Sequence, residues 1–258
     1  IDSEKRVRVA ATVEWEDCGR PVQKVYFETD KRFAENISCN PHAFLVGGIL
    51  PAMFLGEKRI FIDAEICPHL REGLETVMSW FEKWYKGKYK PVCIEAGVSS
   101  KAPYLNKASR AGLFLSGGID SLAALRDNRL RYPLEHPGSV KDGLIVHGFE
   151  ICAHVGRDRK LNIFERAVKL MSKLADETGI TLIPVYTNIR HLNDDGTFWI
   201  DAFFGACLAS VAHVFTPRLS QVYIASGLNI AIMHYPHGSN PLLDVNYSSQ
   251  DMRIEHQG

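Results

Sequence analysis

The stretch that decides the fold spans residues 113–125 and reads LFLSGGIDSLAAL. Apolar residues lead into a pair of glycines, and a segment with helical composition follows directly. Glycines let the backbone adopt conformations closed to other residues and approach a ligand closely. A helix that begins directly after them presents free N–H groups and its positive dipole end to the loop. This order of strand, glycine loop and helix predicts an anion site, and phosphate is the natural ligand.

The polar side chains of this loop fit a nucleotide better than bare phosphate. Ser116 and Ser121 offer hydroxyl donors on either side of Gly117 and Gly118. Asp120 would repel bare phosphate, but it suits a Mg²⁺ ion that bridges the carboxylate to a nucleotide. The plainer interpretation is an ordinary strand-to-helix turn in which Asp120 complements the helix dipole. The loop matches neither the Walker phosphate loop nor the Gly-x-Gly-x-x-Gly dinucleotide fingerprint.

Strands and helices alternate on the carboxyl side of this loop. The predicted strands are 112–115, 143–149, 180–186 and 221–225. The predicted helices are 120–129, 162–178 and 199–215, the last of them preceded by a helix cap within 194–197. This alternation implies a parallel sheet with helices on both faces. We therefore expect an α/β, Rossmann-like domain over residues 110–258.

The first hundred residues predict a small α+β domain. Residues 7–14 and 22–28 read as a β-hairpin, 59–66 as a third strand, and 68–85 as a helix with one apolar face. The basic stretch 97–110, which contains Gly and Ser, separates this unit from the alternating segment, so the expected domains are 1–100 and 110–258. The chain opens on Ile1 and stops at Gly258, and we expect residues to be missing at both ends.

Composition and charge narrow the function classes. Hydrophobic residues make up 46% and charged residues 23% of the chain, as in folded soluble proteins. Thirty basic and thirty acidic side chains give a formal net charge of zero, which argues against a dedicated nucleic-acid binder. The six cysteines form no C-x-x-C pair, and the apolar run Ala43–Leu55 is too short to span a bilayer. A cytoplasmic protein is therefore expected.

The motif SGGIDS at residues 116–121, placed after an apolar strand, resembles the PP-loop of the N-type ATP pyrophosphatases. That superfamily includes asparagine synthetase, GMP synthetase, NAD synthetase, tRNA lysidine synthetase and 7-cyano-7-deazaguanine synthase. The resemblance extends over residues 111–246, and the whole chain resembles bacterial proteins that join a small front domain to such a PP-loop domain. It implies binding of ATP with Mg²⁺, cleavage to AMP and pyrophosphate, and activation of a small-molecule substrate by adenylation, as in ligases.

The resemblance also implies the residues of the site. The nucleotide phosphates would be held by the loop residues Ser116, Gly117, Gly118, Ile119, Asp120 and Ser121, with Ser116 and Asp120 catalytic and Asp120 near the magnesium. The adenine would lie beside His147, Gly148 and Phe149, and the nucleotide and substrate against Ser226, Gly227 and Asn229. Ser239 and Asp244 follow the carboxyl end of a predicted strand, where open α/β sheets bind ligands, and are candidates for substrate contact.

Several alternatives remain open at this stage. His234, His237 and His256 are interpreted as ordinary loop histidines, because their spacing fits no zinc pattern. The chain shows no signature of a glutamine-hydrolysing domain and lacks the C-terminal cysteine cluster of the deazaguanine synthases. One rival function is a nucleotide-binding or scaffold protein without turnover, and another is an enzyme that modifies tRNA or a nucleobase. The sequence leaves open whether the protein forms a homodimer, and no membrane partner is expected.

Overall fold

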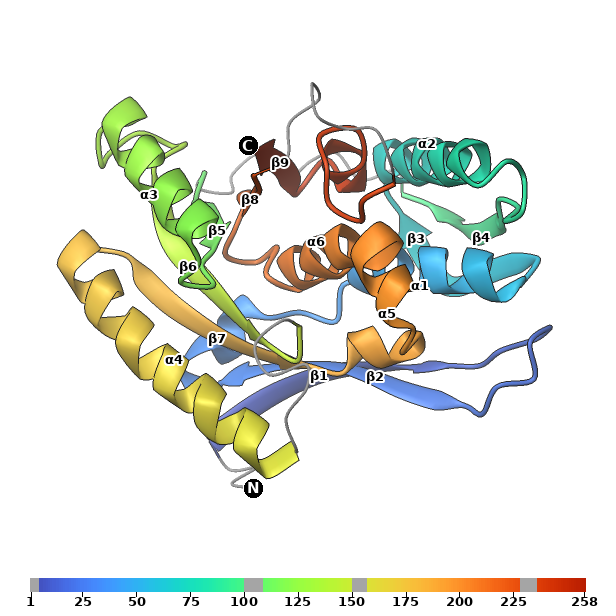
Figure 1. Ribbon diagram of the computed structural model, residues 1–258, viewed down its shortest axis with the longest axis horizontal. Helices are drawn as coiled ribbons and strands as arrows, with labels where there is room; N and C mark the ends of the chain where they lie inside the picture. Colours follow the sequence, from blue (N-terminus) through green and yellow to red (C-terminus); the bar gives the residue numbers. More distant parts are fainter. Residues whose placement is uncertain (1–4, 100–108, 150–156, 228–235) are drawn as a thin grey trace.

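A mostly parallel, seven-stranded sheet forms the centre of the computed structural model, which describes residues 5–99, 109–149, 157–227 and 236–258 (Figure 1). The strand order across the sheet is β1-β2-β7-β6-β5-β8-β9. The strands of this sheet are β1 Arg6–Val13, β2 Gln23–Asp30, β5 Ala111–Phe114, β6 Val140–His147, β7 Thr181–Thr187, β8 Gln221–Ala225 and β9 Arg253–Gln257. The expected α/β, Rossmann-like class is confirmed at this level.

The order of the parallel strands places a crevice at the centre of the sheet. Strand β5 pairs with β6 on one side and with β8 on the other, and β5 to β9 all run parallel. From β5 the chain moves outward through β6 to β7, then returns to the opposite side of β5 as β8. Where the direction of winding reverses in this way, the connections at the carboxyl ends of the two central strands diverge and leave room for a ligand.

Helices cover both faces of the parallel strands (Figure 1). Their bounds are α1 Pro41–Leu55, α2 Pro68–Trp84, α3 Ile119–Arg131, α4 Arg157–Thr178, α5 Gly196–Phe198 and α6 Phe204–Val214. Side chains alternate across each strand, because successive residues point to opposite faces. In β5, Leu113 belongs to the apolar core beneath α3 and α4, whereas Phe114 belongs to the core shared with α1 and α6. Both faces are therefore buried, which explains the continuous apolar runs of these strands.

The two most apolar helices are core elements. The run Ala43–Leu55 lies within α1, which begins after Asn40, whose side-chain oxygen accepts a hydrogen bond from the backbone N–H of His42 at 3.0 Å. Residues Gly196–Val214 form a continuous helical segment that is long and apolar enough to cross a bilayer. However, 78% of the 18-residue apolar stretch within this segment is buried inside the fold. This segment comprises α5, a π-helical turn Trp199–Phe203 and α6. Asp195 caps its start, as predicted, by accepting from Phe198 N–H.

The predicted hairpin forms, and it extends the central sheet. Strands β1 and β2 pair antiparallel from Arg6↔Asp30 to Val13↔Gln23, and β2 then pairs antiparallel with β7. Thr29 Oγ1 donates to the Pro184 carbonyl at 2.7 Å, which adds a side-chain link across that junction. The N-terminal segment, residues 5–99, and the parallel strands thus share one sheet, through β1 and β2, and one hydrophobic core. The division into domains at about residue 100 stays a prediction.

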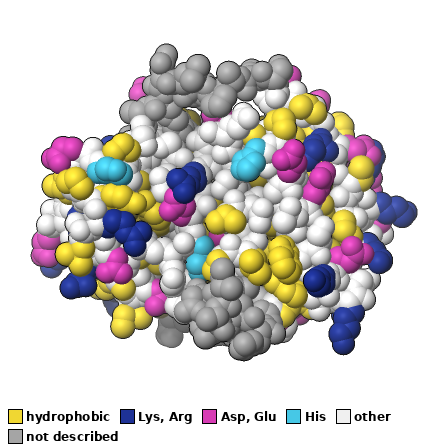
Figure 2. Space-filling view, turned by 90° about the horizontal axis from the view of Figure 1, so that it is seen from above, with side chains coloured by type: hydrophobic (Ala, Val, Ile, Leu, Met, Phe, Trp, Pro, Cys, Tyr) yellow, Lys and Arg dark blue, Asp and Glu magenta, His cyan; other side chains and the backbone are white. Residues whose placement is uncertain are grey.

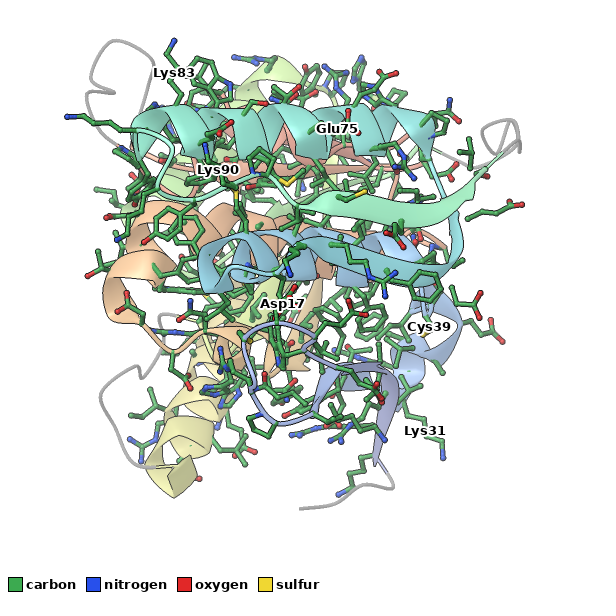
Figure 3. The ribbon with its side chains drawn as sticks, turned by 90° about the vertical axis from the view of Figure 1, so that its right-hand side faces the viewer. Asp17, Lys31, Cys39, Glu75, Lys83 and Lys90 are labelled. Carbon is green, nitrogen blue, oxygen red and sulfur yellow. The ribbon has the colours of Figure 1, made fainter. Side chains whose placement is uncertain are left out.

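The rest of the N-terminal segment packs on the outer side of α1. Strand β3, Arg59–Ile66, pairs parallel with β4, Cys93–Val98, in a separate two-stranded sheet, and α2 connects them. In Figure 3, α2 lies on one side of α1, and the β1–β2 loop with Asp17 lies on the other. The Glu57 side chain, which follows α1, accepts hydrogen bonds from the backbone N–H groups of residues 16–18 and so holds that loop in place.

A buried ion cluster fastens the amino ends of the central strands. Asp142 in β6 is fully buried and accepts hydrogen bonds from Arg110, just before β5, at 2.9 Å and from Arg218, just before β8, at 2.8 Å. The Asp142 carboxylate raises the pKa of the Arg110 guanidinium by this hydrogen bond. Because the three strands are held together at this end, the loops at their carboxyl ends are placed relative to one another.

Candidate functional site

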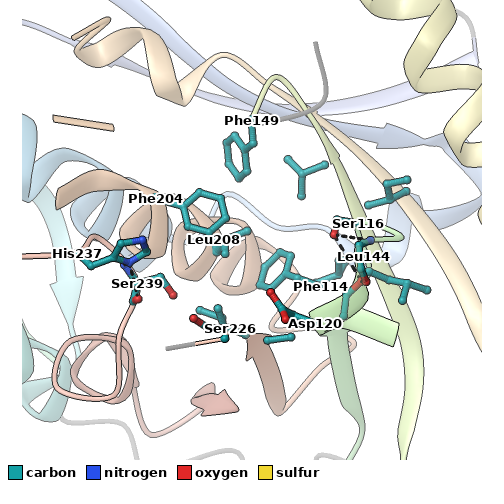
Figure 4. A pocket seen from close by; sticks show the side chains of 18 residues that line it. Phe114, Ser116, Asp120, Leu144, Phe149, Phe204, Leu208, Ser226, His237 and Ser239 are labelled. Atoms are coloured by element: carbon teal, nitrogen blue, oxygen red, sulfur yellow. Dashed lines mark hydrogen bonds between the residues drawn. The ribbon is translucent and has the colours of Figure 1, made fainter. Parts of the chain in front are cut away.

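A cavity of about 400 Å³ opens at the carboxyl ends of β5, β6 and β8, where the strand order predicts a crevice (Figure 4). Its walls come from the loop before α3, from α6 and from the segment 237–239, so parts of the chain far apart in sequence meet there. The lining residues are Phe114, Leu115, Ser116, Gly118, Asp120, Ser121, Leu144, Ile145, Val146, Phe149, Phe204, Leu208, Ile224, Ala225, Ser226, Gly227, His237 and Ser239.

The loop between β5 and α3 holds itself in a tight turn. Ser116 Oγ accepts from the Gly118 N–H at 3.2 Å, and Ser121 Oγ donates to the Gly118 carbonyl at 2.8 Å. Gly117 has a φ of +81°, and a Cβ at this position would come within 3.0 Å of Met171 Sδ in α4. The positive φ therefore favours glycine at 117, and a larger residue would also have to displace the Met171 side chain. As the residue before α3, Gly118 has no side chain to cover the first N–H groups of the helix, which suits an anion.

Asp120 and the end of β8 meet across the cavity. A Cβ built on Gly227 would lie 3.7 Å from Asp120 Oδ1, so these residues are neighbours although 107 positions (227 − 120) separate them in sequence. Ser226 precedes Gly227 and also lines the cavity. Among the described residues, no group of three or more His, Cys, Asp or Glu is placed to hold a metal by itself. Asp120, Ser116 and Ser226 each contribute an oxygen to the cavity lining, and oxygen is the ligand type that hard cations take.

An apolar wall lies opposite the loop at residues 116–121. Phe149 follows β6 and packs against Trp199, with ring centroids 5.2 Å apart. Phe204 and Leu208 stand four residues apart in α6, so both side chains face the same way into the cavity (Figure 4). Arg190 donates to the Phe149 carbonyl at 2.7 Å and lies over the Trp199 ring, which fixes this wall. A flat, largely apolar group fits such a surface.

The segment 237–244 is pinned by a buried network. Ser239 Oγ donates to Asp244 Oδ2 at 2.8 Å, and His256 Nδ1 in β9 lies 2.7 Å from the same oxygen. Burial raises the pKa of the Asp244 carboxyl, and the His256 hydrogen bond acts in the opposite direction. Asp244 is fully buried and is not among the residues that line the cavity. Asp244 therefore holds the loop from behind. The sequence predicts that His256 is a loop histidine, but His256 lies in β9 and its side chain is only 4% exposed.

The structure brings most, but not all, of the predicted site residues to one place. The residues that line the cavity are Ser116, Gly118, Asp120, Ser121, Phe149, Ser226, Gly227 and Ser239. The Ile119 side chain is 83% exposed and points elsewhere. The His147 ring packs on Phe164 and Tyr186, at centroid distances of 5.1 and 5.7 Å, in the core beneath α4. Gly148 has a φ of +98° and serves the turn after β6, and Asn229 lies outside the described residues.

Comparison with protein-family models, with curated proteins and with solved structures found no match to this chain. The interpretation of the site therefore rests on its geometry and on the motif at residues 116–121.

Ten of the lining residues are absent from the sequence-based site; seven of them belong to β5, β6, β8 or the residue after β5, and the other three are Phe204, Leu208 and His237. The spacing of Phe204 and Leu208 indicates a helix face, but not whether that face meets a core or a ligand. His237 lies in a loop with no metal-ligand spacing. The nearest sequence signal for His237 is that it stands two residues before Ser239, which the sequence already marks as a candidate for substrate contact. Only the packing of the loop against α6, through Gly205 N–H to the Gly238 carbonyl at 2.9 Å, brings His237 to the cavity.

Proposed function

We propose that this protein binds Mg-ATP through the loop at residues 116–121 and cleaves it to AMP and pyrophosphate while activating a substrate by adenylation. The observation that carries the proposal is that the glycine loop, Asp120 and the Ser226–Gly227 end of β8 line one cavity. That cavity lies at the point of the sheet where open α/β folds bind ligands. Membership of the PP-loop ATP pyrophosphatases is part of this proposal and rests on the motif.

The loop residues supply the grip on the pyrophosphate. Backbone N–H groups at the start of α3 bind phosphate oxygens, and the loop that presents them is held in place by the hydrogen bonds of Ser116 and Ser121 to Gly118. Donors organised in advance stabilise charge that develops on a leaving group without further rearrangement. None of the described residues that line the cavity is Lys or Arg. Within the described lining, neutralisation of the phosphate charge would come from the loop dipoles and from a cation held near Asp120.

A magnesium ion bound with ATP would neutralise phosphate charge during the reaction. The chain's own residues do the rest. The apolar wall of Phe149, Phe204 and Leu208 excludes water and orients flat groups. A carboxylate or carbonyl-type oxygen of the substrate attacks the α-phosphorus, the bond to the bridging oxygen breaks, and pyrophosphate leaves into the loop. Positioning of the two reactants next to each other accounts for much of the expected rate gain.

The first test is calorimetric titration of Mg-ATP into the unaltered protein, Asp120→Ala and Ser116→Ala. Asp127→Ala is the matched control, because Asp127 also lies on α3, its side chain is 57% exposed, and it pairs with Arg126 at 3.8 Å. We expect at least a tenfold loss of affinity for the two loop variants and none for the control. Stabilisation by ligand at about 100 times its Kd should reach about 2.7 kcal/mol. Absence of Mg-ATP binding to the unaltered protein would refute the proposal.

The second test separates an enzyme from a nucleotide-binding scaffold. Exchange of labelled pyrophosphate into ATP, measured with a panel of small carboxylic acids, reports adenylation. Binding without any exchange would favour the scaffold. Modification of nucleic acid is disfavoured by the net charge of zero, and on the described part of the face in Figure 2 basic and acidic side chains are interspersed rather than gathered into a basic patch. The cytoplasmic location, the small-molecule substrate and a homodimer stay predictions.

A further inference from the structure

Strand β1 is the outermost strand of the central sheet at one margin of the fold (Figure 1). The backbone of Tyr26 in β2 points towards β7, because its N–H donates to Asn188 Oδ1 at 2.9 Å and its carbonyl accepts from Thr187 Oγ1 at 2.7 Å. Ala10 of β1 lies directly opposite Tyr26, so this pair is not hydrogen-bonded. The even-numbered residues of β1 therefore direct their N–H and C=O groups away from the sheet.

This outer edge of β1 is almost unoccupied. The even-numbered residues are Arg6, Arg8, Ala10 and Thr12. Among the described residues, the one hydrogen bond to their outward backbone groups comes from Cys39, whose Sγ lies 3.7 Å from the Ala10 carbonyl oxygen. A thiol is a weak donor. Such a row of backbone groups is a template on which a further strand can pair.

The devices that usually protect an edge strand are missing from β1. The strand has eight residues, RVRVAATV, with no proline, and it pairs with β2 in one continuous register without a bulge. The outer edge of β4 shows how this chain closes an edge elsewhere. Arg71 of α2 donates to the carbonyls of Ile94 and Ala96 at 2.7 and 3.2 Å. No comparable side chain of the described residues covers β1.

The two arginines of β1 do not guard its edge either. The Arg6 guanidinium lies over the Tyr186 ring of β7 at 3.7 Å, and Arg8 lies over the Tyr26 ring of β2 at 4.1 Å. Both also pair with Glu28 of β2. They are thus drawn back across the face of the sheet, away from the free backbone groups.

The edge of β1 is complementary to a second copy of itself. Antiparallel pairing about a two-fold axis at Ala10 sets even-numbered residues opposite even-numbered ones, so outward backbone groups meet outward groups. The half-buried valines on the face that packs on the main core meet small apolar residues of the second copy. An axis at Arg8 would instead set like charges opposite each other. The pairs about Ala10 are Arg6 with Glu14, Val7 with Val13, Arg8 with Thr12 and Val9 with Ala11.

We propose that β1 is a dimer interface at which two copies of this chain join their central sheets, antiparallel, about a two-fold axis at Ala10. The charges favour a second copy as the occupant, because Arg6 at one end of the edge and Glu14 at the other are complementary to their own reverse. Strands β2 and β7 separate β1 from β6, so the cavity stays open in the dimer. The inference goes beyond the proposed function and does not depend on it.

Sedimentation of the full chain over a concentration series measures the dissociation constant of the dimer. Ala10→Pro is the main variant. Its missing N–H belongs to the outer edge, so the pairing of β1 with β2 is kept while both hydrogen bonds at the axis are lost. Ala10→Ser is the matched control, because serine is small and keeps the N–H. We expect Ala10→Pro to raise the dissociation constant at least tenfold, as the loss of two hydrogen bonds implies, and Ala10→Ser to stay within about twofold.

A second variant covers the case in which proline disturbs the fold. Glu14 is exposed, and Glu14→Arg sets two arginines opposite each other at both ends of the interface. This change should also weaken the dimer, by more than Glu14→Gln, which only removes the attraction. Tryptophan fluorescence during urea unfolding shows whether each variant is folded. If Ala10→Pro is unfolded, the comparison of Glu14→Arg with Glu14→Gln decides.

Cysteine crosslinking locates the interface in the unaltered protein. Because Cys39 lies beside Ala10, the two Cys39 side chains of the dimer flank the axis. A short thiol crosslinker should join two chains of the unaltered protein and of Cys93→Ser, but not of Cys39→Ser. Cys93→Ser is the matched control, because Cys93 is also exposed but lies in β4.

A protein that sediments as a monomer at every concentration measured would overturn the inference. So would a dimer that a folded Ala10→Pro or Glu14→Arg leaves unchanged, since such a dimer uses another surface. Crosslinking that persists in Cys39→Ser and disappears in Cys93→Ser would have the same meaning.

Discussion

Replacement of Gly205 by alanine should both destabilise the fold and displace the loop that carries His237. Gly205 is the second residue of α6, and its N–H donates to the Gly238 carbonyl at 2.9 Å. An added Cβ would collide with that same carbonyl oxygen and come within 2.5 Å of Asp244 Oδ1 and 3.0 Å of the Ser239 Cα. Two of these three atoms belong to the backbone of a loop held by several hydrogen bonds, so they cannot move away as the end of a flexible side chain would.

The magnitude follows from two opposing effects. Overpacking a buried contact costs about 1–3 kcal/mol, whereas alanine in a helix gains up to about 1 kcal/mol over glycine. We expect a net loss of about 1–2 kcal/mol in the free energy of unfolding, or a fall of a few degrees in Tm for a chain of this size. Mg-ATP affinity should be retained, because the collision involves residues 238–244 and not the loop at residues 116–121.

Urea unfolding, followed by tryptophan fluorescence, measures the stability change. Gly196→Ala is the matched control, because Gly196 begins a helix, has no positive φ, and a Cβ there would meet no atom within 4 Å. The control should be unchanged or slightly more stable, by about 0.4–1 kcal/mol. If Gly205→Ala has the same unfolding midpoint as the control, the reasoning about tight packing between α6 and the loop is wrong.

Three further predictions concern the fold. Asp142→Ala should lower the free energy of unfolding by about 3–5 kcal/mol, because it leaves Arg110 and Arg218 without their shared buried carboxylate, and an unchanged urea midpoint would contradict this. Burial holds the pKa of His42 below its ordinary value of 6.5, so the unfolded chain binds a proton more readily. The free energy of unfolding should therefore be at its full value above pH 6.5 and fall as the pH drops below it, by at most about 1.4 kcal/mol per pH unit for this group. A pH series of urea unfolding curves should show a smaller slope for His42→Gln, and an identical slope would refute the assignment. Glu57→Gln should cost about 1–3 kcal/mol and speed amide exchange at residues 16–18, because a neutral amide has only one acceptor oxygen for three N–H donors; unchanged exchange there would show that the loop holds without this carboxylate.

Periodicity and glycine placement are enough to predict most of the central elements. The predicted strands at 59–66 and 221–225 coincide with β3 and β8, and the helix at 68–85 ends one residue beyond α2. These elements carry their own signals, because alternation and helical spacing report which side of a segment is buried. α1 has no such signal. It is apolar on nearly all sides, so its period does not distinguish a helix from a loop or a buried strand.

The loop at residues 116–121 was also accessible from the sequence, because a glycine pair between a strand and a helix is a local signature. Its neighbours across the cavity were not. Gly227 approaches Asp120, and His237 faces the same cavity, only because β8 returns to the side of β5 opposite β6 and because α6 holds the Gly238 backbone. Pairing of distant strands and a hydrogen bond from a helix to a remote loop leave no mark in local composition.

The amino acid sequence by itself therefore determined the α/β class, the alternation of strands and helices from residue 111 to 225 and the candidate phosphate loop, since each depends on residues next to one another in the chain; it did not predict β9, Arg253–Gln257. Only the tertiary structure decided that the β1–β2 hairpin joins the central sheet, that Asp244 and His256 lie behind the loop and not in the cavity, and that His147 packs in the core. Those outcomes depend on which surfaces are buried together, and burial is a property of the whole fold.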